Sequence, residues 1–138
     1  MDKYKSDQTV YDPKKKKFVP LWRLDIHTIT VTHFNPDTLT EEMRTYSADY
    51  IRHHIHYCES KYPDYIRRLV NEGKIIQYLD DMKLKVDAAI KSQVARWKQT
   101  DSEYKEDLRN GDTEKIIGLE NCFTGMAREV IFDCMIYI

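Results

Sequence analysis

The residues whose types could perform chemistry gather in one short stretch, 52–58, which contains three histidines and a cysteine. His54 and Cys58 are four residues apart, and His53 and His56 are three apart, so each pair would share one face of a helix. Imidazole and thiolate bind zinc, but a structural zinc site needs four ligands and the sequence holds no second pair at such spacing. We therefore expect no metal and no cofactor, with His54 and Cys58 facing the core and His53 and His56 facing solvent.

Sequence patterns of catalysis are missing. The chain has no serine nucleophile elbow, no HExxH sequence and no paired carboxylates in a known catalytic setting. Its four glycines are scattered and cannot build a phosphate-binding loop. We therefore expect a binding protein and not an enzyme.

Basic residues form two groups that could hold nucleic-acid phosphates. The first occupies the predicted turn of a β-hairpin, as in a β-wing that contacts the DNA backbone, and consists of Lys14, Lys15, Lys16 and Lys17. The second flanks a helix–proline–helix turn and consists of Arg52, Lys61, Arg67, Arg68 and Lys74. A helix–turn–helix would place the helix over 63–72 in a groove, although Asp64 and Glu72 disfavour deep insertion. The alternative is a solvated basic face.

Tyrosines and acidic residues suggest a protein-binding surface instead. Ten residues are Tyr, which is enriched at interfaces because it is amphipathic, although the same residues also suit a core. The candidate interface consists of Tyr46, Tyr50, Tyr57, Tyr62 and Tyr65. Residues 101–120 hold seven acids against three bases, a net charge of −4, and residues 1–24 hold the reverse, +4. The acidic segment could imitate nucleic acid, or the asymmetry could be the ordinary scatter of a charge-rich surface.

Hydrophobic spacing predicts the elements that position these groups. Residues 8–24 fit a hairpin with its turn at Asp12-Pro13 and its second strand ended or confined to a sheet edge by Pro20. Residues 25–37 fit either a third strand or an extended segment lying on helices. From Thr38 the period becomes helical, and Thr38 with Glu41 makes a capping-box pattern.

Further helices follow that first one. Pro63 ends it and begins a short second helix, which Gly73 ends. A long third helix is predicted over about 74–99, and a last helix begins at Asp112 or Thr113 after the Asn110-Gly111 break. We expect a mainly α fold, an antiparallel helical bundle or long helical hairpin with a small N-terminal β-hairpin. It would form a single domain over 1–138, with the hairpin and extended segment in 1–37 and the bundle in 38–138.

From its composition we expect the protein to be soluble and cytoplasmic. The 138 residues are 41% hydrophobic and 33% charged, and the N-terminus lacks the apolar core of a secretory signal. The apolar runs fall short of the roughly 20 residues that a membrane span needs. Three cysteines, an odd number without a CxxC pair, suit free thiols in a reducing compartment. The apolar C-terminal tail, 130–138, needs cover and favours a homodimer.

Residues that suit packing in a core, or the beginning and end of helices and strands, follow a pattern along most of the chain. They are Phe18, Val19, Pro20, Leu21, Tyr57, Pro63, Tyr65, Leu69, Gly73, Lys74, Leu79, Asn121, Ala127, Glu129, Val130, Ile131, Ile136 and Tyr137. On these residues the chain resembles the TnpV family, small transposon-encoded proteins of mobile elements in Gram-positive bacteria. The resemblance implies a helical fold and residence on a mobile genetic element. Members are compared loosely with excisionases, and no residue-level binding site comes with that comparison.

Two functions remain open from the sequence. The first is an accessory protein of a mobile element that binds DNA or a nucleoprotein complex, in an excisionase-like role. The alternative is a protein-binding inhibitor of a host or phage-defence effector such as a CRISPR nuclease.

Overall fold

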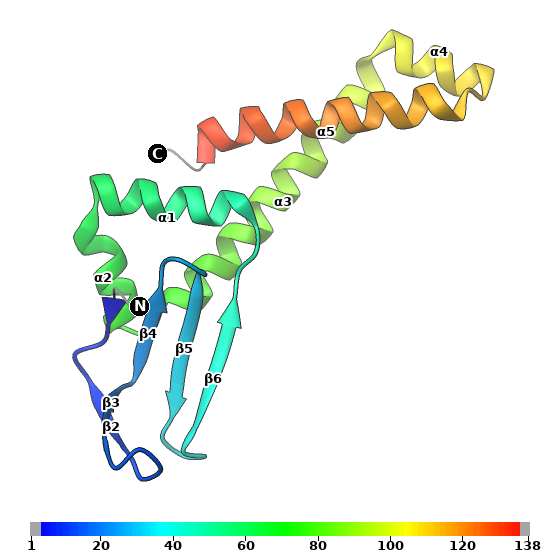
Figure 1. Ribbon diagram of the computed structural model, residues 1–138. Helices are drawn as coiled ribbons and strands as arrows, with labels where there is room; N and C mark the ends of the chain where they lie inside the picture. The colour runs from blue at the N-terminus through cyan, green and yellow to red at the C-terminus, as the bar shows by residue number, and fades with distance from the viewer. Residues whose placement is uncertain (1–3, 136–138) are drawn as a thin grey trace. The chain divides into compact units, whose positions relative to one another are not determined.

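The structure, a computed structural model, describes residues 4–135 (Figure 1). The chain divides into two compact units, residues 1–82 and 83–138, and the division falls within one long helix. Ile136 and Tyr137, which carry part of the family resemblance and of the predicted apolar tail, lie outside the described residues.

The first unit contains two antiparallel sheets. Its strands are β1 (Tyr4–Lys5), β2 (Thr9–Asp12), β3 (Lys17–Pro20), β4 (Trp22–Asp25), β5 (Thr30–Asn35) and β6 (Thr40–Thr45). Strands β2 and β3 pair as a hairpin, and the other four form a sheet in the order β1-β4-β5-β6. The predicted hairpin is therefore confirmed, and of the two possibilities for residues 25–37 the strand is correct.

Local chemistry explains the hairpin. The Asp12 carboxylate accepts a hydrogen bond from the Lys14 backbone N–H at 2.9 Å, which fixes the start of the turn. Lys16 adopts a left-handed conformation with φ of 54° and returns the chain into β3. Pro20 ends β3, as predicted, because it cannot donate a further hydrogen bond to a sheet.

The predicted start of the first helix at Thr38 is wrong, because residues 40–45 form the edge strand β6 and the helix, α1 (Asp49–Lys61), begins only at Asp49. All six residues of this strand are exposed, so it shows no alternation of buried and exposed positions, and Glu and Met favour helices. Pairing with β5 overrides that preference: the Thr30 and Thr45 hydroxyls lie 3.0 Å apart across the two strands. A charged, exposed edge strand also avoids pairing with other chains.

Helices of the first unit cover one face of the four-stranded sheet (Figure 1). They are α1 (Asp49–Lys61), α2 (Pro63–Asn71) and the beginning of α3 (Ile75–Thr100). Pro63 starts α2, and Gly73, with φ of 71°, follows its end, as predicted. The core side chains that are fully buried in this unit are Leu24, Ile29, Val31, Ile51, Ile55, Ile66, Val70, Ile75 and Leu79.

The second unit contains the rest of α3, then α4 (Ser102–Asn110) and α5 (Thr113–Met135). The Asp101 carboxylate caps α4 by accepting the Tyr104 N–H at 2.8 Å. The Phe123 ring lies 5.9 Å from the rings of both Trp97 and Tyr104, measured between centroids. These three aromatic rings join the three helices. The long third helix and the break before the last helix are confirmed.

The fold as a whole is mixed α/β. The predicted mainly α bundle, or long helical hairpin with a small N-terminal β-hairpin, is wrong because a four-stranded antiparallel sheet accompanies the hairpin. Residues 22–45 supply three of its four strands, whereas the sequence placed residues 22–24 in the hairpin, allowed one strand in 25–37 and predicted a helix from Thr38. No helix within residues 4–135 is long and apolar enough to cross a membrane.

Candidate nucleic-acid interface

The tip of the β2–β3 hairpin carries four exposed lysines, Lys14 to Lys17. Lys15 is engaged, because its Nζ lies 3.2 Å from Glu41 Oε1. Within residues 4–135 the other three side chains make no ion pair, and the nearby Asp12 is buried against its own turn. Residues 8–20 therefore present a charge of +3, four lysines less one aspartate. A fixed turn with unneutralised ammonium groups suits an anionic ligand.

A polar hollow on the sheet lies beside this tip. It has a volume of about 520 Å³ and is lined by Lys15, Arg23, Asp25, Thr28, Thr30, Thr32, Glu41 and Met43. Glu41 forms two ion pairs there. Its Oε1 lies 3.1 Å from Arg23 Nη2 and 3.2 Å from Lys15 Nζ. Glu41 therefore neutralises part of the positive charge on this face.

The second basic group is engaged within the first unit. Arg52 Nη1 donates to the His27 carbonyl oxygen at 2.6 Å, which joins α1 to the turn between β4 and β5. Arg67 Nη1 lies 3.5 Å from Asp64 Oδ1, and Lys74 Nζ lies 3.3 Å from Glu72 Oε2. The cationic ends of Lys61 and Arg68 lie over the rings of Tyr57 and Tyr65, 5.7 and 6.0 Å from their centroids. These five side chains are less available to phosphates than the hairpin lysines.

The turn between α1 and α2 differs from a DNA-binding helix–turn–helix. Tyr62 alone separates the two helices, whereas that motif uses a turn of about three or four residues. The hairpin tip lies at the end of the sheet that holds the β5–β6 turn, and Arg52 lies at the opposite end (Figure 1). The structure therefore does not bring Arg52 together with the hairpin lysines.

The tyrosine face predicted from the sequence is divided. Tyr46 and Tyr50 are buried in the first unit. The Tyr46 hydroxyl donates to Asp80 Oδ1 at 2.9 Å, and burial with this hydrogen bond raises the pKa of Tyr46. Tyr57 is half-buried, while Tyr62 and Tyr65 are 50% and 37% exposed. The last two line a surface hollow of about 480 Å³ with Lys61, Pro63, Asp64 and Arg68.

The histidine and cysteine cluster is part of the core. His54 and Cys58 are buried and His53 and His56 are exposed, as predicted. His54 Nε2 is hydrogen-bonded to the Tyr78 hydroxyl at 2.5 Å and lies 3.4 Å from Cys58 Sγ. Burial raises the pKa of the Cys58 thiol, which disfavours a reactive thiolate. In the described part of the chain no three His, Cys, Asp or Glu side chains are placed to hold one metal ion.

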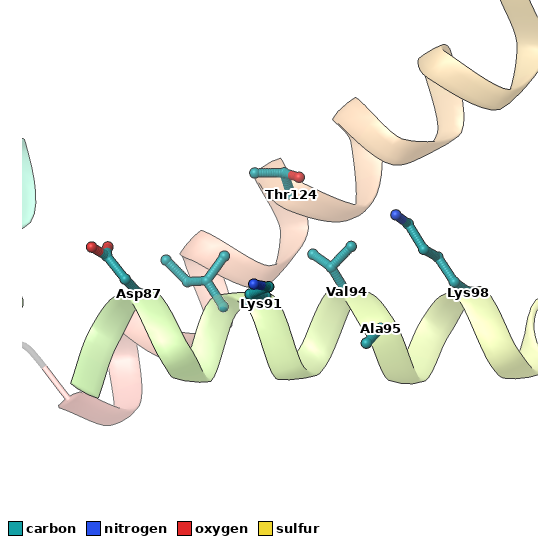
Figure 2. Close-up of a pocket in the computed structure, with 7 residues that line it drawn as sticks. Asp87, Lys91, Val94, Ala95, Lys98 and Thr124 are labelled. Atoms are coloured by element: carbon teal, nitrogen blue, oxygen red, sulfur yellow. The ribbon is translucent and has the colours of Figure 1, made fainter. Parts of the chain in front are cut away.

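In the second unit a groove lies between α3 and α5 (Figure 2). Its volume is about 400 Å³, and it is lined by Asp87, Ile90, Lys91, Val94, Ala95, Lys98 and Thr124. The groove is mainly apolar, with charged groups spaced along the α3 side. No buried polar group converges on it, so its chemistry does not select a ligand.

In the acidic 101–120 segment, fewer carboxylates are free to act as an interaction surface than the sequence predicts. Asp101 caps α4, Asp107 is buried, and Asp112 accepts the Lys115 N–H at 3.3 Å. The Glu120 carboxylate accepts the Tyr104 hydroxyl at 2.9 Å. Four of the seven acids thus serve the second unit itself, which weakens the interpretation of this segment as an imitation of nucleic acid.

Two functional candidates were missed by the sequence interpretation: Tyr11 and Phe18, on the hairpin that carries the lysines. Tyr11 is 47% exposed and Phe18 is 69% exposed. Their strand positions beside a lysine run were visible in the sequence, but an aromatic residue in a short β-prone stretch is usually part of a core.

Comparisons with protein families, with characterised proteins and with solved structures found no match to this chain. We therefore infer the function from the residues of this chain.

Proposed function

We propose that the protein is a non-enzymatic, cytoplasmic accessory factor of a mobile genetic element, which binds DNA or a nucleoprotein complex through its hairpin tip. The observation that carries the proposal is the set of three exposed lysines, Lys14, Lys16 and Lys17, without carboxylate partners in the described chain. The resemblance to TnpV, whose members are compared loosely with excisionases, supports an excisionase-like role in recombination.

Binding to phosphates predicts how strongly the affinity depends on the salt concentration. Each phosphate neutralised on duplex DNA steepens the logarithmic salt dependence by about 0.9, so three lysines give a slope near −2.7. Over the range from about 50 to 200 mM salt, this slope lowers the affinity roughly 40-fold.

The test is fluorescence anisotropy with a labelled mixed-sequence duplex, titrated in salt over that range. The triple variant Lys14→Ala, Lys16→Ala, Lys17→Ala should lose most of the affinity and most of the slope. A matched control removes three cations that have partners: Lys61→Ala, Arg67→Ala, Lys74→Ala. The proposal fails if the parent does not bind at 50 mM salt, if its binding ignores salt, or if the control triple is equally damaging.

The second candidate function is the protein-binding inhibitor. The observation that favours it is the exposed pair Tyr62 and Tyr65 at the rim of a hollow with Lys61 and Arg68. Such a rim could anchor the effector of a defence system. Replacing both tyrosines by alanine should then abolish capture of the effector and leave DNA binding unchanged. Capture of a recombinase and its DNA alone would contradict this function.

A homodimer is part of the main proposal. Met126 and Val130, four residues apart on α5, are both exposed and apolar, which supports a contact between copies. Sedimentation equilibrium across micromolar concentrations tests it, and a Met126→Glu, Val130→Glu variant should stay monomeric. A parent protein that is already monomeric at the highest concentration would contradict the dimer.

A further inference from the structure

The hairpin that carries the lysines also exposes two aromatic rings. Tyr11 and Phe18 are directly opposite each other in the register of β2 and β3. Their rings contact edge to face, with centroids 5.4 Å apart and planes at 66°. Phe18 is 69% exposed. Among the large hydrophobic residues of the described chain only Leu84 is as exposed.

The pleat of the hairpin explains why these rings point outward. Residues that face each other across an antiparallel pair lie on one side, and the next pair lies on the other. The neighbouring pair is Val10 and Val19, and Val19 is buried. The hairpin therefore packs its valine side on the first unit and presents Tyr11 and Phe18 to solvent. The fold itself gains little from a phenylalanine in this position.

The charge around the rings indicates what would cover them. Lys16, at the turn, is two residues before Phe18, about 7 Å of chain away, whereas Lys17 is opposite Asp12 in the register and therefore lies on the valine side of the hairpin. Asp12, the carboxylate nearest in sequence, is buried and bonded to the Lys14 N–H. A complementary ligand thus has flat apolar faces and a closely attached anionic backbone. Unpaired nucleotides have both, whereas the bases of an intact duplex hide their faces in the stack.

We propose that the Tyr11–Phe18 pair stacks on the bases of single-stranded nucleic acid while the lysines of the turn, Lys14 and Lys16, hold its phosphates. This inference rests on the proposed function and narrows it: the preferred ligand is an unpaired strand. Tyr11 supports Phe18 from the edge, so the more exposed Phe18 makes the larger contribution.

The experiment compares a labelled twelve-nucleotide oligothymidine with a duplex of matched length, using the full chain. Phe18→Ala should weaken binding to the single strand about 5- to 150-fold, the range given by loss of one stacked base. Binding to the duplex should change less than about twofold. Phe18→Trp should keep the affinity and Phe18→Leu should not, because leucine is apolar but has no π-face. Tyr62→Ala removes a similarly exposed aromatic ring and is the matched control.

The outcomes separate this inference from the proposed function. If Phe18→Ala weakens both ligands equally or neither, while the lysine triple still loses affinity, stacking is wrong and phosphate binding stands. If no oligonucleotide binds at 50 mM salt, both are wrong. Polyglutamate that competes as well as the oligothymidine would assign the surface to an acidic protein and overturn the inference, as would a Phe18-dependent dimer without oligonucleotide binding. An oligouridine of the same length distinguishes RNA from DNA as the source of the unpaired strand.

Discussion

Trp22 lies so close to Gly73 that a Cβ atom on Gly73 would stand 2.7 Å from the indole Nε1. Gly73 also needs a left-handed conformation, with φ of 71°, at the turn that follows α2. Trp22 belongs to β4, and its ring stacks on His33 of β5 with centroids 4.1 Å apart. The contact between Trp22 and Gly73 therefore joins the sheet to the turn between α2 and α3.

Gly73→Ala should destabilise the protein more than Gly111→Ala. Both glycines have positive φ, but a Cβ on Gly111 meets nothing within 4 Å. The backbone cost alone is about 1–2 kcal/mol, and only Gly73→Ala adds the collision with Trp22. Gly125→Ala, in open space on a helix, should be neutral or stabilising by up to about 1 kcal/mol. Urea denaturation of the three variants measures this, and equal costs for Gly73 and Gly111 would refute the role of Trp22.

Alkaline pH should destabilise the protein through buried tyrosines. Burial, the charge of Glu59 and a 3.3 Å hydrogen bond to Glu59 raise the pKa of Tyr4 to about 12. Because the unfolded chain releases this proton near pH 10, the contribution of Tyr4 is present below pH 10 and is lost between about pH 10 and 12. Urea unfolding at pH 8.5 and pH 11 should show a smaller loss for Tyr4→Phe than for the parent, by on the order of 1 kcal/mol. Parallel pH profiles for the two proteins would contradict the shifted pKa.

The three thiols should react at two different rates. Cys122 and Cys134 are exposed, whereas Cys58 is buried beside His54 and has a raised pKa. In the monomeric Met126→Glu, Val130→Glu variant, Ellman's reagent should label two thiols per chain promptly and the third only after addition of denaturant. Cys58→Ala should remove the slow thiol and leave the fast pair. Three thiols of equal rate in the native protein would mean that this part of the core opens readily.

Local sequence signals predicted several elements correctly because their causes are local. Proline at the start of α2, glycine after its end and aspartate before α5 act within a few residues of their own positions. The hairpin turn depends on Asp12 and on the residues that follow it. The burial of His54 and Cys58 followed from their spacing on α1.

The sheet and the aromatic pair required information that lies elsewhere in the chain. Strand β6 is stabilised by partners 5 to 15 residues away in the register, such as Asn35 with Thr40 and Thr30 with Thr45. Its own residues, Thr-Glu-Glu-Met-Arg-Thr, suit a helix as well as an edge strand. Phe18 points outward because the other side of the hairpin is buried. The alternation of side chains along a strand predicts that the hairpin has two sides, but it does not predict which of them is buried.

Glu41→Gln should strengthen binding to nucleic acid. Glu41 Oε1 holds Lys15 Nζ at 3.2 Å and Arg23 Nη2 at 3.1 Å beside the hairpin tip. Removing this charge frees Lys15 for a fourth phosphate, so the salt slope should steepen by about 0.9 and the affinity at 50 mM salt should rise several-fold. The free energy of unfolding should change by no more than about 1 kcal/mol, because both ion pairs are largely solvated.

The matched control for that variant is Glu42→Gln, one residue further along β6. It makes the same change in net charge, but Glu42 accepts the Asn35 side-chain amide at 3.1 Å and faces His33, so its removal releases no lysine. Anisotropy titrations of both variants over the same salt range therefore separate a local effect at the tip from a general change in charge. Equal gains for the two variants would indicate the general change, and a loss of affinity in Glu41→Gln would place Lys15 outside the interface.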